Sequence, residues 1–182
     1  MAGTSGNGRA FWGAATAVVV LDVATKFAAE RLLQPHVPQM ILGDIVRFTL
    51  AYNPGAAFSM SLGSASRWIF GAFACVALVV LWRLYRGSGP GDRLKALALG
   101  LAWGGAAGNL IDRVRSTAGV VDFIDIGVRN ARFWTFNVAD MAVSVGAFLL
   151  AVVLWSEDRA AEAATPAPLA ASELQRESSE AT

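Results

Sequence analysis

Four stretches of the 182-residue chain are apolar enough to cross a bilayer as helices, and polar connections separate them. A helix over residues 11–33 would be about 34 Å long, which exceeds the ~30 Å hydrocarbon core. Further spans are expected at about residues 66–86, 93–112 and 136–155. The first stretch alone resembles a signal-peptide core, but its apolar character resumes after Asp22 and Lys26. The pattern therefore predicts an all-α polytopic membrane protein.

The polar connections differ from one another in composition. Residues 45–52, IVRFTLAY, favour a strand, and the NPG that follows signals a turn. We expect a small β-cradle at about residues 43–62, resting at the membrane surface. Residues 1–10 are expected to form a flexible leader, residues 11–156 one transmembrane domain, and residues 157–182 a disordered tail rich in Ala, Glu and Ser.

Composition narrows the chemistry that is available to the chain. Hydrophobic residues make up 55% and charged residues 16%, below the roughly 25% charged residues of soluble domains. A net charge of +1 argues against a nucleic-acid partner. Cys75 and His36 are the single cysteine and histidine, which excludes an intramolecular disulfide and a Cys- or His-rich metal site. We expect no metal or cofactor, so carboxylates, amides, hydroxyls and arginines must supply the chemistry.

Short loops predict the orientation. The loop at residues 83–95 carries three arginines and Lys95 against one acid, so it should be cytoplasmic, with both termini on the same side. The connections at residues 34–67 and 113–135 then lie outside. The second of these is also rich in arginine, but its arginines alternate with Asp112, Asp122 and Asp125, and local pairing can account for them.

With this topology, polar residues collect at the outer ends of the spans, where ionisable groups are costly and indicate a site. Several have a structural interpretation: an intrahelical pair for Asp22 and Lys26, and a hydrated loop for Asp125. Asp112 beside Arg113 fits a solvated helix end as well as a site. Asn53 and four glycines can serve turns and close helix packing. These glycines are Gly55, Gly104, Gly105 and Gly108.

Asp122 and Asp140 favour a catalytic interpretation. Both follow small or apolar residues, and neither has a basic residue within four positions. Two carboxylates in contact share a proton, because both cannot ionise cheaply. The ionised member can take a proton from an attacking water while the protonated member donates to a carbonyl oxygen. This is the chemistry of aspartic peptidases.

Five motifs, in order, resemble those of the prolipoprotein signal peptidases, also called signal peptidase II. They are DVATK at residues 22–26, YNPGAAFS at 52–59, GGAAGNLIDR at 104–113, VVDF at 120–123 and FNVAD at 136–140. The resemblance covers about residues 11–155. It implies a multi-pass protein of the bacterial inner membrane, with four transmembrane helices, a small periplasmic-side β-cradle and an outward-facing active site. It further implies that the chain binds the cyclic peptide globomycin. We also expect a monomer that needs no cofactor.

The resemblance also assigns residues. Asp122 and Asp140 would be the catalytic dyad, and Asn109 and Arg113 would hold the substrate backbone. The implied substrate is a prolipoprotein with a diacylglyceryl-modified cysteine, cleaved just before that cysteine. The remaining residues expected to support or line the pocket are Asp22, Lys26, Asn53, Gly108, Asp112 and Asn137.

Two other classes of function compete with an aspartic endopeptidase. A small proton-coupled membrane transporter would place a carboxylate near the middle of a span, whereas the acids here cluster at one end. A non-catalytic assembly protein would tolerate replacement of both Asp122 and Asp140.

Overall fold

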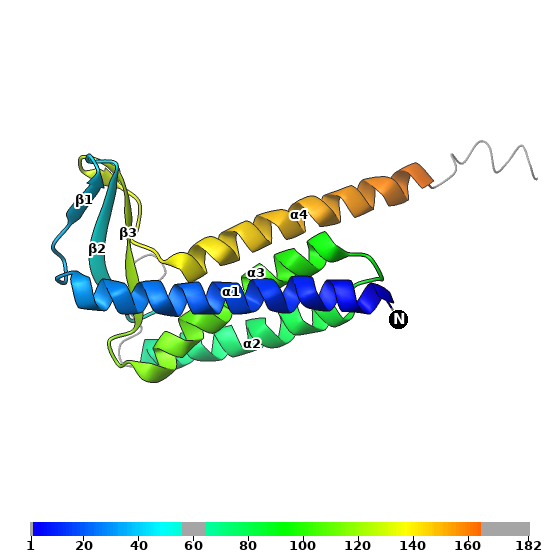
Figure 1. The fold of residues 1–182 in the computed structure, drawn as a ribbon, viewed down its shortest axis with the longest axis horizontal. Coiled ribbons are helices and arrows are strands. Elements are labelled where there is room, and N and C mark those ends of the chain that lie inside the picture. The colour runs from blue at the N-terminus through cyan, green and yellow to red at the C-terminus, as the bar shows by residue number, and fades with distance from the viewer. Residues whose placement is uncertain (1, 56–64, 165–182) are drawn as a thin grey trace, which may run out of the picture.

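Four long helices lie side by side, with a small sheet at one end (Figure 1). The computed structural model describes residues 2–55 and 65–164. Helix α1 spans Ala2–Leu32, α2 Ser66–Arg86, α3 Arg93–Arg115 and α4 Val138–Ala164. All four are long and apolar enough to cross a membrane, which confirms the predicted four-span architecture. Residues 56–62 of the expected cradle, including the end of the YNPGAAFS motif, and residues 165–182 lie outside the described residues.

The helices extend beyond the predicted spans. Helix α1 begins at Ala2, so most of the expected flexible leader is helical, and Asn7 is tied to the α2–α3 turn by a 2.9 Å hydrogen bond from its Nδ2 to Gly89 O. Helix α4 continues to Ala164, which makes residues 157–164 helical where a disordered tail was expected. Alanine and glutamate favour helix there, and Glu157 pairs with Lys95 at 2.9 Å.

Helix α3 is the central helix and packs against the other three. Its glycines allow this close approach. A Cβ at Gly104 would lie 2.8 Å from Ala15 O of α1, and one at Gly105 would collide with Ala139 O of α4. Small residues at these positions let the backbones meet, as is typical of membrane helices.

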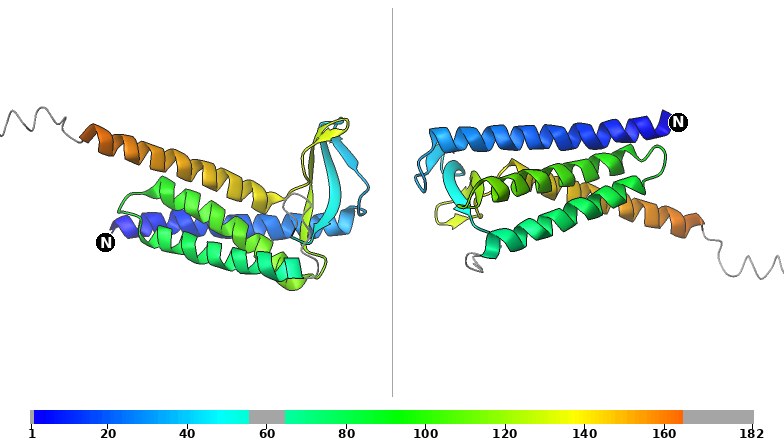
Figure 2. Two further views of the ribbon diagram at one scale, coloured as in Figure 1. Left: turned by 180° about the vertical axis from the view of Figure 1, so that it is seen from behind. Right: turned by 90° about the horizontal axis from the view of Figure 1, so that it is seen from below.

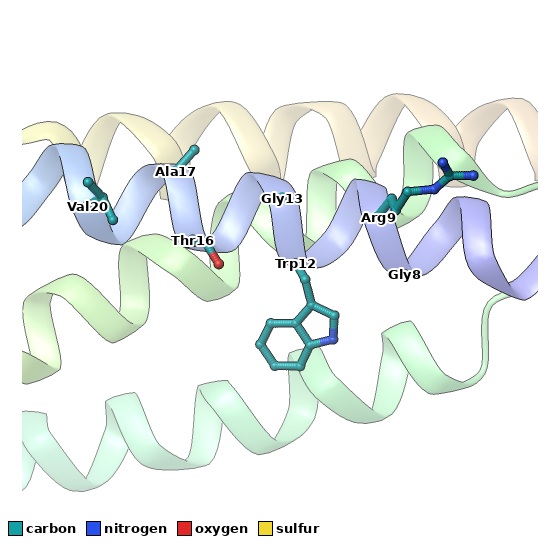
Figure 3. A pocket seen from close by; sticks show the side chains of 7 residues that line it. All are labelled: Gly8, Arg9, Trp12, Gly13, Thr16, Ala17 and Val20. Atoms are coloured by element: carbon teal, nitrogen blue, oxygen red, sulfur yellow. The ribbon is translucent and has the colours of Figure 1, made fainter.

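Aromatic side chains fill the end of the bundle away from the sheet. Phe11 is fully buried and stacks on Tyr85, with ring centroids 4.1 Å apart. Figure 3 shows Trp12 extending from α1 toward α2, where its ring centroid lies 5.5 Å from that of Trp82. A largely apolar hollow runs along this part of α1. Its lining residues are Gly8, Arg9, Trp12, Gly13, Thr16, Ala17 and Val20.

The sheet is antiparallel, with strand order β1-β2-β3-β4. Strand β2 (Val46–Asn53) lies within the expected cradle, and β1 (Gln39–Leu42) precedes it. Strands β3 (Val120–Val128) and β4 (Ala131–Arg132) were not predicted. The sheet stands across the end of the bundle, as Figure 2 shows from two sides. A buried cluster of Ala29, Leu50, Val121 and Phe123 packs it against α1.

Asp125 corrects one expectation. It lies on β3, is 7% exposed, and accepts a 2.6 Å bond from Arg132 Nε and a 3.2 Å bond from Thr49 Oγ1. The hydrated-loop interpretation was therefore wrong, because β3 pairs with β2 and turns Asp125 toward Thr49. Asp44 joins the same network through Arg47 and Arg132, so this end of the sheet is held together by ion pairs.

Candidate active site

The backbone brings β3 and the start of α4 together. Ile124 N donates to Phe136 O at 2.8 Å, and Phe136 N returns a 3.0 Å bond to Ile124 O. Asp122 lies two residues before this bridge and Asp140 four residues after it. Val121 and Phe123 point into the core against α1, and because strand side chains alternate, Asp122 faces the other way. These features place both acids at the start of α4.

A capping box begins α4. Asn137 Oδ1 accepts the backbone N–H of Asp140 at 2.9 Å, and the N–H of Asn137 donates to Asp140 Oδ2 at 3.3 Å. This reciprocal pair satisfies two backbone donors that a helix start leaves open. The N–H of Ala139 is satisfied by Asp22 Oδ1 of α1 at 2.9 Å. The FNVAD motif thus has a local structural role as well as carrying Asp140.

Asn137 links the two acids. Its side chain is fully buried, and Nδ2 lies 2.6 Å from Asp122 Oδ1 while its backbone N–H meets Asp140. Asn109 on α3 holds the other side of Asp140, donating from Nδ2 to Oδ1 at 2.7 Å. Asn53 at the end of β2 also hydrogen-bonds Asp122. Three asparagines, from β2, α3 and the start of α4, therefore hold the pair.

Asp122 is buried, with 4% of its surface exposed. Burial, and next the negative charge of Asp140, raise the pKa of its carboxyl from 3.8 to about 7, against opposing hydrogen bonds from Asn137 and Asn53. In the described part of the chain, neither acid has an ion-pair partner within 4 Å. Asp122 can therefore keep a proton at neutral pH beside a second carboxyl.

A buried ion cluster lies behind the pair. Lys26, only 1% exposed, has its Nζ 2.7 Å from Asp22 Oδ2, 2.8 Å from Asp112 Oδ2 and 3.0 Å from Asn109 Oδ1. The expected Asp22–Lys26 pair is present, but it is shared with α3. Gly108 makes room for it, since a Cβ there would lie 2.5 Å from Asp22 Oδ2. The cluster orients Asn109, which in turn holds Asp140.

Sequence reasoning missed the outer part of this network. Asp112 accepts a 2.9 Å bond from Arg115 Nε, and Arg115 Nη2 reaches Glu30 on α1 at 2.9 Å. Glu30 hydrogen-bonds Tyr52 on β2, and burial together with this carboxylate raises the pKa of the Tyr52 hydroxyl. Only the three-residue spacing of Asp112 and Arg115 on one helix could have suggested part of it.

Arg113 lies beside the acids without pairing with them. Its Nη1 donates to Asn109 O at 3.0 Å, and its guanidinium lies 5.9 Å from the Phe70 ring centroid. Its buried Nε has no hydrogen-bond partner among the described residues. A largely apolar cavity of about 350 Å³ lies against Asp140 and the first turns of α4. Its lining residues are Phe133, Phe136, Asp140, Met141, Ser144 and Val145.

The chain shares its sequence and fold with known proteins. A lipoprotein signal peptidase of Polynucleobacter necessarius subsp. necessarius (strain STIR1) is 40% identical over 145 residues, covering 78% of this chain and 85% of that protein. Another, from Coxiella burnetii (strain Dugway 5J108-111), is 44% identical over 142 residues, covering 75% and 84%. A solved bacterial membrane enzyme superposes with a TM-score of 0.71 at 26% identity, over 80% of this chain and 87% of that one.

The match extends over nearly all of the described bundle and sheet. A family model described as signal peptidase (SPase) II covers residues 14–156, which include α2, α3, the sheet, most of α1 and α4, and both carboxyls at the start of α4. The chain therefore belongs to the signal peptidase II family.

Proposed function

We propose that this protein is a membrane-embedded aspartic endopeptidase that removes signal peptides from diacylglyceryl-modified prolipoproteins, cutting just before the lipidated cysteine. Membership of the signal peptidase II family supports signal-peptide removal as the activity. The observation that carries the aspartic mechanism is the pair of carboxyls joined through Asn137, one of them with a pKa near neutrality.

In this mechanism Asp122 holds the proton and Asp140 is ionised. Asp140 takes a proton from a water molecule as that water attacks the scissile carbonyl carbon. Asp122 gives its proton to the carbonyl oxygen, which forms a neutral tetrahedral intermediate. Asp140 then passes its proton to the leaving nitrogen as the C–N bond breaks, and Asp122 recovers a proton when the carbonyl reforms. No proton is gained or lost by the pair over the cycle.

The surroundings of the pair suit an extended, lipid-bearing substrate. Arg113 Nε, which has no partner among the described residues, can donate to a substrate carbonyl, and the family resemblance assigns Arg113 this role. The apolar cavity beside Asp140 can take an apolar part of the substrate, since Phe133 and Met141 in its lining are themselves exposed. The substrate would thus be held by Arg113 and by the cavity next to Asp140.

For the orientation, we propose that the sheet and the acids face the periplasm and that both termini are cytoplasmic. The basic turn between α2 and α3 supports this, because positive loops favour the cytoplasmic side. We further propose that the chain acts as a monomer in the inner membrane, without cofactor or nucleic-acid partner. The transporter alternative has less support, because both paired acids lie at the sheet end of the bundle.

The test is cleavage of a purified diacylglyceryl-modified prolipoprotein by the full-length protein in detergent. Asp122→Asn and Asp140→Asn should each abolish cleavage while the protein remains folded. Asp125→Asn is the matched control, because Asp125 is a buried acid on the same strand that pairs with Arg132 and not with the dyad. It should retain cleavage. Turnover by either dyad variant near the wild-type rate would exclude the proposed mechanism.

A further inference from the structure

A polar cavity of about 350 Å³ lies at the opposite end of the bundle from the carboxyls. Its lining residues are Asn7 of α1, Tyr85 and Arg86 of α2, and Ser88 of the α2–α3 turn. Figures 1 and 2 show the start of α1 beside that turn, far from the sheet. Its volume falls in the range of about 300–1,000 Å³ typical of ligand pockets. Because all four helices span the membrane, this cavity lies at the membrane surface away from the proposed active site.

Asn7 lines the cavity and carries a buried hydrogen-bond acceptor. The residue is 6% exposed, and its Nδ2 donates to Gly89 O at 2.9 Å, which fixes the orientation of the amide. The Oδ1 atom is buried and has no hydrogen-bond partner among the described residues. A buried acceptor without a donor is costly, so this oxygen favours a ligand that brings an O–H or N–H group.

Arg86 gives the same cavity a positive charge. Its guanidinium lies 5.7 Å from the Trp82 ring centroid and forms no ion pair within 4 Å in the described part of the chain. The Arg93 guanidinium packs nearby, since a Cβ at Gly6 would lie 3.0 Å from Arg93 Nε. Guanidinium groups bind phosphate oxygens through two parallel hydrogen bonds. The cavity thus combines an anion site with an acceptor for a donor group.

We propose that this cavity binds the headgroup of an anionic phospholipid that also carries hydroxyl groups, of the phosphatidylglycerol type. The phosphate lies against Arg86, and a glycerol hydroxyl donates to Asn7 Oδ1. The position at the membrane surface favours a lipid over a soluble ligand, because a phospholipid presents its headgroup at that depth. This lipid site is separate from the peptidase site and does not rest on the proposed cleavage activity.

Native mass spectrometry of the purified full-length protein in neutral detergent tests the proposal. The protein is titrated with phosphatidylglycerol and with phosphatidylmethanol of the same acyl chains, which has the same charge but no headgroup hydroxyl. Phosphatidylglycerol should bind saturably, one per chain, and about tenfold more tightly, as expected for one good hydrogen bond. Arg86→Gln should weaken phosphatidylglycerol binding by about tenfold or more.

Arg83→Gln is the matched control, because Arg83 lies in the same basic last turn of α2 but does not line the cavity. It should leave phosphatidylglycerol binding unchanged. Asn7→Ala should remove the preference for phosphatidylglycerol over phosphatidylmethanol; if that variant does not fold, the wild-type lipid comparison still decides. Equal weakening by both arginine variants, equal binding of the two lipids by the wild type, or displacement of the lipid by inorganic phosphate at equal concentration would each overturn the proposal.

Discussion

Replacing Asp122 with asparagine is expected to abolish cleavage and yet make the folded protein more stable at alkaline pH. The carboxyl is buried, and its pKa is raised from 3.8 to about 7, so ionising it in the folded protein is costly. A raised carboxyl pKa gives stability that is fully present below the unfolded value and is lost as pH rises through the folded value. The free energy of unfolding of the wild type should therefore fall between about pH 4 and pH 7. The Asp122→Asn variant should not show this fall, because it has no proton to lose at this position.

The size of the effect follows from the shift. Between pH 5 and the folded pKa of about 7 lie roughly two units, each worth about 1.4 kcal/mol, or nearly 3 kcal/mol in all. The substitution also removes one hydrogen bond. The carboxyl accepts from both Asn137 and Asn53, whereas an amide in its place offers one oxygen and one NH₂ group. That cost of about 1 kcal/mol is the same at both pH values and cancels in the comparison.

The assay is the melting temperature of both proteins in detergent at pH 5 and pH 8. Between pH 5 and pH 8, the melting temperature of the wild type should fall by roughly 5–10 °C more than that of the variant. Asp140→Asn supplies a second check, because removing the neighbouring negative charge should shift the window of lost stability to lower pH. An identical change of melting temperature with pH in wild type and Asp122→Asn would refute a proton held on Asp122.

Three further outcomes follow. The kcat/KM for prolipoprotein cleavage should fall as pH rises through about 7, where Asp122 loses its proton; a flat rate profile from pH 6 to pH 9 would contradict this. Lys26→Met leaves Asp22 buried without a cation and Asp112 with Arg115 alone, so it should cost about 3–5 kcal/mol. Low yield and a lower melting temperature would show this cost, whereas wild-type stability would show that the cluster is dispensable. Gly108→Ala places a Cβ against Asp22 and should lower the melting temperature. Gly13→Ala is the control: its Cβ meets no atom within 4 Å, so it should raise the melting temperature slightly through better helix propensity. Equal effects of the two variants would contradict the close packing of α3.

The sequence could predict the spans because a long apolar run in a membrane protein has few possible structures other than a transmembrane helix. It also singled out Asp122 and Asp140, since an acid without a nearby base in an apolar setting is unusual. Strand β3 escaped prediction because Val120–Val128 is apolar at its start and carries two acids, so it shows no simple alternation. Its partner β2 lies some 70 residues earlier, as in the pair Ala51 and Asp122.

Contacts between helices escaped prediction for the same reason. The sequence placed Lys26 with Asp22 one turn away, but the bond from Lys26 to Asp112 depends on how α1 and α3 are rotated against each other. The interpretation of Asp125 failed because the surrounding loop was assumed to be hydrated, while β2 covers it. Local chemistry was readable from the sequence; partners on distant elements were not.

The distribution of cations explains why one pair of buried acids in this region is structural and the other is available for catalysis. Lys26 lies between Asp22 and Asp112, and Arg115 also pairs with Asp112, so both carboxylates have cationic partners. These acids hold α1, α3 and the start of α4 together. No such cation reaches Asp122 or Asp140 within 4 Å among the described residues; amide groups hold them instead. An amide orients a carboxyl but brings no positive charge, so a buried carboxyl held by amides still favours its protonated form. A lysine placed between the two acids would stabilise both in their ionised forms, and the pair would then lack the proton on which the proposed chemistry depends.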